Sequence, residues 1–348
     1  MPNPYTGRPD FSFWKRSVAI DAADVDPVVS AKITIAQQDR VATAGSCFAQ
    51  HISRTLIRQG FNYLVTETGP EARGYGVFPA RFGNIYSVRQ LLQLFRRAYA
   101  IFEPRDEAWT RPDGALVDPF RPQVEPDGFA TIDALRADRE THLAAVRLMF
   151  ETCDVFIFTL GLTEAWRSTA DGAVFPLAPG VVAEAGHADV AFHNFDVAEM
   201  TADLRAFIAD LRIVNPAVGI ILTVSPVPLI ATYEDRHVLV STAYSKAALR
   251  VVAEEVSRQD PGVAYFPSYE IITGAHAGNS FYEPGLREVT PLGVETVMAL
   301  FSRHCLASEA RPARVLAPSV ASAARTASDE RDLVALQAIV CDEEAIVR

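Results

Sequence analysis

Residues 39–60 read DRVATAGSCFAQHISRTLIRQG, and this stretch decides the fold. Residues 40–46 are small and β-branched, as in a buried strand, and residues 47–59 place apolar side chains near helical spacing. Ser46 and Cys47 stand where the strand gives way to the helix. There the helix dipole and backbone N–H groups can stabilise a thiolate or an oxyanion. In the alternative interpretation, Ser46 caps the helix and Cys47 is a small buried apolar residue.

Strand and helix patterns alternate along the rest of the chain. Residues 154–160 and 219–224 are continuous apolar runs, typical of strands covered on both faces. The other predicted strands are 40–46, 61–66 and 263–267; the helices are 47–59, 86–100, 131–151, 196–213, 240–258 and 290–304; hairpins are predicted at 109–122 and 167–185. This alternation predicts a three-layer α/β/α fold, with a parallel sheet and inserted hairpins.

The chain divides into four predicted segments. Residues 1–38 form an N-terminal wrap and residues 39–306 the main domain. Residues 307–327 are rich in Ala, Ser, Pro and Arg and are predicted to be a linker. Residues 328–348 are acidic, and are either an amphipathic helix that docks on the domain or a partner, or a flexible tail.

Composition limits the functions of the chain. It has 348 residues, a net charge of −11 and a pI near 5.2, which argues against nucleic acid or an anionic membrane as the main partner. There is no apolar signal segment and no run of about 20 apolar residues, so we expect no membrane span and a cytoplasmic location. The four cysteines lack the spacing of a metal site, and we expect free thiols and no metal.

Four polar segments follow the predicted strands. In an open parallel sheet ligands bind beyond the carboxyl ends of the strands. The segments there are AGSCFAQH at 44–51, GLTEAW at 161–166, SPVPLIATYEDRH at 225–237 and PSYEIITGAH at 267–276. Each alone could be ordinary turn chemistry, but together they predict a site. Of the seven histidines, His142 and His304 fall inside predicted helices and are expected to be structural.

An ordered set of motifs resembles the GSCFA family, named for the pentapeptide at 45–49. The further matching motifs are FGNIY at 82–86, FTLGLTEAW at 158–166, TVSPVPL at 223–229, YSKAALR at 244–250 and YFPSYEI at 265–271. The family is thought to be related to the SGNH, or GDSL-like, hydrolases. This resemblance implies a flavodoxin-like fold and action on acyl esters, often acetyl groups on carbohydrates, by hydrolysis or by acyl transfer.

The resemblance also implies roles for single residues. Gly45, Ser46 and Cys47 match the GDS turn of the SGNH hydrolases, and this comparison puts Cys47 in the nucleophile position. The segment from Gly161 to Glu164 matches the GxND motif. The residues that this comparison places at an oxyanion or substrate site are Gly45, Asn84, Gly161, Thr163 and Ser225, and the catalytic candidates are Cys47, Ser46, His237 and Glu164.

One part of the chain departs from the related families. They carry a DxxH motif before the last helix, and here FYEPGLREVTP has Gly285 and Glu288 at the Asp and His positions. Another base must therefore serve Cys47. We expect His237, which follows a strand end, with His51 and His276 in reserve; Glu288 could act as a base or orient a histidine.

The leading hypothesis is an SGNH-like acyltransferase or esterase with a Cys47 or Ser46 nucleophile and a small-molecule or saccharide acceptor. A cytoplasmic location favours acyl-CoA as co-substrate without a bound cofactor, and Lys246 and Arg81 are candidate phosphate contacts, or else surface or structural charges. The alternative is a non-catalytic protein that binds a saccharide or a partner. A third hypothesis is a redox sensor in which Cys153 approaches Cys47.

Overall fold

A parallel four-stranded sheet forms the centre of the protein. The computed structural model describes residues 3–185, 189–307 and 342–347. The strands are β1 (Val41–Gly45), β4 (Val155–Leu160), β8 (Gly219–Val224) and β9 (Val263–Phe266), in the order β1-β4-β8-β9. All three pairings are parallel. Every residue of β1 and β4 is buried, as their uninterrupted apolar sequences predict.

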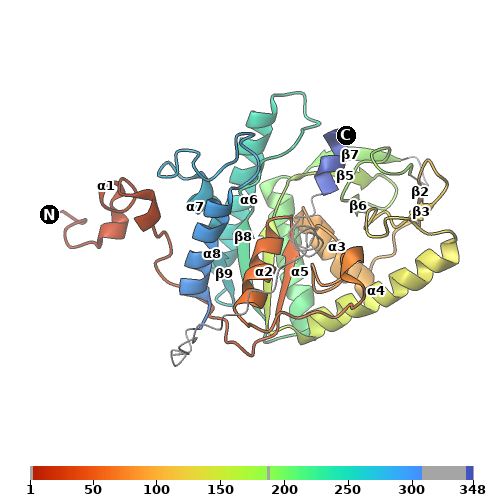
Figure 1. Cartoon of the computed structure of the whole chain (residues 1–348), viewed down its shortest axis with the longest axis horizontal. Helices are drawn as coiled ribbons and strands as arrows, with labels where there is room; N and C mark the ends of the chain where they lie inside the picture. The colour runs from red at the N-terminus through yellow and green to blue at the C-terminus, as the bar shows by residue number, and fades with distance from the viewer. Residues whose placement is uncertain (1–2, 186–188, 308–341, 348) are drawn as a thin grey trace, which may run out of the picture.

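Helices cover both faces of this sheet (Figure 1). Side chains alternate along β4, so Val155 and Ile157 enter one core while Phe156 and Phe158 enter the other. The first core is closed by α2 (Ala49–Arg58), α7 (Ser268–Thr273) and α8 (Pro291–Cys305), and the second by α3 (Val88–Ala98), α4 (Ile132–Thr152), α5 (Val197–Val214) and α6 (Val238–Gln259). The predicted three-layer α/β/α fold is confirmed.

One predicted strand is wrong. Residues 61–66 form a single parallel bridge between Tyr63 and Val41 instead of a strand. The segment leaves the sheet early because Thr66 turns to the loop beside it, where its backbone N–H donates to the carbonyl of Pro79. The short helix α7 was not predicted, since six residues between a strand and a loop carry too little periodicity.

Two small antiparallel sheets are inserted between the main strands. β2 (Trp109–Thr110) and β3 (Leu116–Val117) form the predicted hairpin. The hairpin predicted at 167–185 is part of a three-stranded sheet in the order β6-β5-β7. Its strands are β5 (Glu164–Ser168), β6 (Val174–Phe175) and β7 (Val190–Asn194). Its central strand therefore begins immediately after the carboxyl end of β4.

The described parts of the two chain ends lie on different sides of the domain (Figure 1). The N-terminal elements η1 (Asp10–Ser12), α1 (Trp14–Ser17) and η2 (Ala22–Asp24) bury no side chain. Closer to the sheet, Ile35 is buried; its N–H donates to the carbonyl of Cys305 and its own carbonyl accepts from Ala307. The predicted linker lies outside the described residues except for Ala307. Of the predicted acidic tail, the structure describes η4 (Asp342–Val347).

Candidate active site

The carboxyl ends of β1 and β4 form the crevice in which a ligand is expected. The segment around Tyr63 forms a bridge on the outer side of β1. If this segment is counted as the second strand in chain order, the main sheet has the order second, first, third, fourth, fifth, and its topological switch point lies between β1 and β4. The segment before α3 crosses this point. Ile85 N–H donates to the carbonyl of Gly45 at 2.9 Å, and the N–H groups of Gly161 and Leu162 both donate to the carbonyl of Tyr86 at 3.0 Å. Three matched motifs therefore meet at one place.

The turn after β1 requires a glycine and presents the two candidate nucleophiles. Gly45 has φ +144°, and a Cβ there would lie 2.5 Å from the carbonyl oxygen of Thr159. Ser46 does not cap the helix, because α2 begins at Ala49 and the buried Ser46 Oγ has no hydrogen-bond partner within the described residues. Cys47 follows with 4% of its surface exposed. The turn thus holds both side chains inside the protein, under the crevice.

Lys246 is a buried cation at this turn. It is 1% exposed, and its Nζ donates to the carbonyl of Gly161 at 2.7 Å. The neighbouring Ser245 Oγ accepts from the N–H of Thr163 at 3.2 Å. Both residues lie on the buried face of α6, one turn before Leu249. A lysine within the apolar stripe of a predicted helix was the signal that could have indicated this buried position. The expectations for Lys246 were a phosphate contact, a surface charge or a structural charge, and its burial rules out the surface charge.

Burial changes the titration of Lys246. Desolvation lowers the pKa of Lys246 to about 8, and the nearby Glu343 and Cys47 act in the opposite direction. Arg287 also lies close enough to lower the pKa of the lysine. An amine poised near neutral pH beside a thiol is suited to proton transfer.

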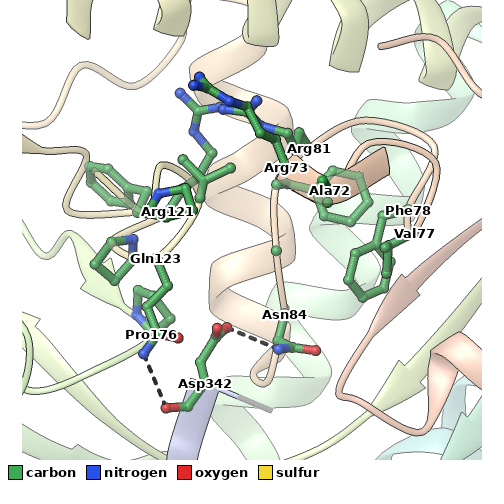
Figure 2. Close-up of a pocket in the computed structure, with 17 residues that line it drawn as sticks. Ala72, Arg73, Val77, Phe78, Arg81, Asn84, Arg121, Gln123, Pro176 and Asp342 are labelled. Carbon is green, nitrogen blue, oxygen red and sulfur yellow. Dashed lines mark hydrogen bonds between the residues drawn. The ribbon is translucent and has the colours of Figure 1, made fainter. Parts of the chain in front are cut away.

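Asn84 forms a donor site that Asp342 occupies (Figure 2). Its Nδ2 donates to Asp342 Oδ2 at 2.9 Å. Burial raises the pKa of Asp342, and hydrogen bonds from the side chain and the backbone of Asn84 oppose that rise. Gly83, with φ +72°, leaves open the space next to the carboxylate, since a Cβ there would lie 3.9 Å from Asp342 Oδ2. A backbone N–H and an amide that converge on one oxygen-bearing group are the donors an oxyanion site needs.

A second carboxylate from the same segment lies beside Lys246. Glu343 is 6% exposed and accepts from Arg287 Nη2 at 2.6 Å. Burial raises the pKa of Glu343, while the charges of Arg287 and Lys246 lower it. Arg287 belongs to the loop that departs from DxxH. Sequence analysis missed both residues because nothing local in the sequence connects this loop with residues almost sixty positions away.

The remaining residues of the GLTE and SPVPL motifs organise the loops around the crevice. Glu164 accepts from Thr232 Oγ1 at 2.6 Å and from the N–H of Tyr233 at 3.1 Å. It therefore holds the loop after β8 and is a positioning residue. Ser225 Oγ accepts from the N–H of Val227 at 3.3 Å. Thr163 is fully buried, and its Oγ1 has no partner among the described residues.

The described contacts of the predicted histidine bases are made with residues other than Cys47. Within residues 3–185, 189–307 and 342–347, no hydrogen bond joins Cys47 Sγ to a histidine. His237 is exposed and caps α6, with Nδ1 accepting from the N–H of Leu239. The ring of His51 packs against Phe48, and burial, with nearby Arg54 and Arg58, lowers its pKa to about 4.

Among the described residues, the contacts of the other two reserves are also made with residues other than Cys47. The ring of His276 lies 6.5 Å from that of Phe281. Glu288 is exposed, and its carbonyl accepts from the N–H of Glu283. The two structural histidines predicted within helices are confirmed by their partners: His142 pairs with Glu67 and His304 with Asp26, each at 2.7 Å.

The expected approach of Cys153 to Cys47 is wrong. Cys153 precedes β4, whereas Gly45 pairs with Thr159 at the other end of that strand. Six residues of strand correspond to about 20 Å, and a disulfide requires Cα atoms within about 7 Å. Burial raises the pKa of Cys153 to about 12, so this thiol stays protonated. The redox-sensor hypothesis therefore loses this partner; the structure does not describe Cys341.

A mainly apolar pocket of about 200 Å³ adjoins Asn84 and Asp342 (Figure 2). Arg73, Arg81 and Arg121 lie at its opposite end. Arg81 is not a surface charge, because its guanidinium is buried, pairs with Glu125 and stacks over the ring of Tyr75. The apolar lining includes Val77, Phe78, Phe82, Phe120, Val124 and Pro176. The pocket therefore leads from the arginine cluster to the donor site at Asn84.

The described residues contain neither a cluster of metal-ligating side chains nor a helix suited to cross a membrane. No group of three or more His, Cys, Asp or Glu side chains there could hold a metal ion. Among the helices of the same residues, none combines the length and the apolar character needed to cross a membrane.

Comparisons with known proteins agree with the motif pattern. The GSCFA family model matches residues 40–301, which is most of the chain, and the chain belongs to the GSCFA family. No curated protein matches it. A solved structure, a carbohydrate esterase family 3 protein from Talaromyces cellulolyticus, is 13% identical and has a TM-score of 0.28; the match covers 63% of this chain and 89% of the esterase. Likeness at that level carries no functional argument, so the function is argued from the site.

Proposed function

We propose that the protein is an SGNH-like acyl-transfer enzyme in which Cys47 carries the acyl group. The observation that carries the proposal is the meeting of a thiol, a buried amine and an oxyanion-type donor pair at the switch point of the sheet. Lys246 interacts electrostatically with Cys47, and Asn84 offers its amide and backbone N–H groups nearby. Cysteine is the better nucleophile at neutral pH, so Cys47 is favoured over Ser46.

The proposed reaction has two halves. Neutral Lys246 takes the thiol proton as Cys47 Sγ bonds to the carbonyl carbon of an ester or thioester. The carbonyl oxygen becomes an oxyanion held by Asn84, with Thr163 as a further donor. The bond to the alcohol or thiol then breaks, and the Lys246 ammonium returns the proton to the leaving group. Water or a sugar hydroxyl then attacks the acyl-cysteine and gives its proton to Lys246. The bond between the acyl carbon and Cys47 Sγ breaks, the acid or the new ester leaves, and the Lys246 ammonium returns the proton to Cys47 Sγ.

In this proposal Lys246 takes the role of the histidine that a DxxH motif would supply. His237 was expected there, but it is exposed and caps α6. Lys246 is instead fixed by its hydrogen bond to Gly161 and has a pKa near neutral pH. The acyl donor is proposed as acyl-CoA or an ester, and the acceptor as a saccharide or related hydroxyl.

The test is the intact mass of the protein after incubation with acetyl-CoA or with p-nitrophenyl acetate. A single acetyl adduct is expected on the parent chain. The adduct should disappear in Cys47→Ala and persist in Cys153→Ala, a matched control because that thiol is buried at the other end of β4. An adduct that survives Cys47→Ala but not Ser46→Ala would transfer the role to the serine.

A non-catalytic binding protein is the second candidate. The observations that favour it are the burial of Cys47 and the presence of the Asp342 carboxylate on the Asn84 donors. This candidate predicts no adduct with either donor, together with retained binding of a saccharide or a partner after Cys47→Ala.

A further inference from the structure

The C-terminal segment η4 occupies the site through both of its buried carboxyl groups. Asp342 is bound from three sides: its carboxylate accepts from Asn84, its N–H donates to the hydroxyl of Tyr86 at 3.2 Å, and its carbonyl accepts from Gln123 at 3.5 Å. Asn84 and Tyr86 belong to the segment that crosses the switch point. Specific contacts to the backbone and the side chain of one residue indicate a defined docking position.

The second carboxyl group neutralises the cations of the site. Glu343 pairs with Arg287 at 2.6 Å and interacts electrostatically with Lys246. Both carboxyl groups are nearly inaccessible, Asp342 at 7% and Glu343 at 6% exposure. The other end of the segment faces solvent, with Ile346 45% and Val347 63% exposed. Asp342 and Glu343 thus anchor the segment, and two of their partners, Asn84 and Arg287, belong to the candidate active site.

This position conflicts with turnover. Cys47 is 4% and Lys246 1% exposed, so an ester cannot reach the thiol while the surroundings stay as they are. An oxyanion and the Asp342 carboxylate also need the same Asn84 donors. The pocket ends at Asn84 and Asp342, so the carboxylate occupies the Asn84 donors at the end of the pocket (Figure 2).

We propose that residues 342–347 are an intramolecular inhibitor, which closes the Cys47 site by placing Asp342 on the Asn84 donors and Glu343 on Arg287. The segment leaves before substrate enters. An anionic ligand that competes for Arg287, or a partner that binds the exposed Ile346 and Val347, would promote its release. This inference rests on the proposed function, because it describes how that site is regulated. The occlusion of Cys47 can be tested whether or not the site transfers acyl groups.

The experiment measures access to Cys47. The parent and a chain that ends at residue 341 are treated with iodoacetamide, and alkylation of Cys47 is followed by site-resolved mass spectrometry. We expect the shortened chain to react at least tenfold faster, equivalent to a closing free energy of about 1.4 kcal/mol or more. Asp342→Asn and Glu343→Gln, made together in the full chain, should accelerate alkylation in the same direction. Val347→Ala, at an exposed position of the same segment, should not.

Addition of the segment as a separate peptide provides a control for unfolding. The peptide DEEAIVR at millimolar concentration should slow alkylation of the shortened chain, whereas NQEAIVR should not. Millimolar peptide is needed because it replaces a tethered segment of high effective concentration. If DEEAIVR slows alkylation and NQEAIVR does not, the shortened chain keeps a folded site.

Acylation of the same chains separates this inference from the proposed function. Faster alkylation with faster acetyl-adduct formation supports both. Faster alkylation without any adduct in either chain supports occlusion and contradicts the acyl-transfer proposal. Equal alkylation rates overturn the inference. Faster alkylation with loss of an adduct that the parent forms also overturns it, because the segment would then be part of the catalytic machinery.

Discussion

Lys246→Met tests the proposed base directly, because methionine keeps much of the side-chain volume and removes the amine. With a pKa of about 8, about a tenth of the Lys246 side chains are neutral at pH 7; at the ordinary value of 10.5 only about 0.03% would be. Burial therefore raises the fraction of usable base about 300-fold. Removing a general base typically costs 10²–10⁴ in rate, and we expect acylation of Cys47 to slow within that range.

The same change should have a small effect on stability. Holding a protonated lysine at a pKa 2.5 below its ordinary value costs the folded state about 3 kcal/mol at pH 7. The variant does not carry this cost, but it loses the 2.7 Å hydrogen bond from Lys246 to the carbonyl of Gly161. It also removes the positive charge of Lys246 from the neighbourhood of Glu343. These contributions oppose each other, so we expect the free energy of unfolding to change by less than about 2 kcal/mol.

The assay is single-turnover acylation followed by intact mass from pH 6 to 10, with urea unfolding as the stability control. In the parent chain the rate should rise about tenfold between pH 6 and 7, reach about half of its maximum near pH 8 and level off above it. A Lys246→Met chain with the parent's rate and pH profile would refute the role of Lys246 as base. A loss of rate explained by unfolding would assign the lysine a structural role only.

Three other perturbations have distinct expected results. Gly45→Ala should lower the free energy of unfolding, measured by urea titration, by at least about 3 kcal/mol, because its Cβ would overlap the carbonyl of Thr159 at a positive φ. The control is Gly285→Ala, which has open space around it and should change the free energy of unfolding by less than about 0.5 kcal/mol. His237→Gln should leave acylation within twofold and cost at most about 1 kcal/mol of stability as a lost cap, and a hundredfold loss of rate would restore the histidine as base. Burial lowers the pKa of His142 to about 4, so between pH 6.5 and 4 the unfolded chain binds a proton that the folded chain does not. Stability should therefore fall by about 2–3 kcal/mol from pH 7 to 4.5, and His142→Gln should reduce that slope in urea titrations at the two pH values.

The layered fold could be predicted because its information is local. The apolar runs at 154–160 and 219–224 and the amphipathic helices between them are visible in single windows of sequence, and they are the elements that the structure confirms. The segment 61–66 has a strand's composition, but a contact made by Thr66 outside the sheet ends its pairing. Tertiary context of this kind cannot be seen in a short window.

The site could be predicted only where residues lie next to strands. The turn at Gly45–Cys47 and the GLTE segment were located from strand ends. Lys246 required knowing which face of α6 is buried, and Arg287 and Glu343 meet only through the tertiary fold. The preference for His237 came from expecting a histidine to be the base, whereas the helix uses that side chain as its cap.

The backbone contacts of Ile35 also bear on how this chain could be re-engineered. Its hydrogen bonds with Cys305 and Ala307 form a short parallel bridge between the segment that precedes β1 and the segment that follows α8. Residues paired in this way are about 5 Å apart, so a linker of a few residues could connect them. A circular permutant opened at the exposed turn around Gly114 would keep every strand of the central sheet in its register. Such a rearranged chain would present the Gly45–Cys47 turn without the C-terminal acids.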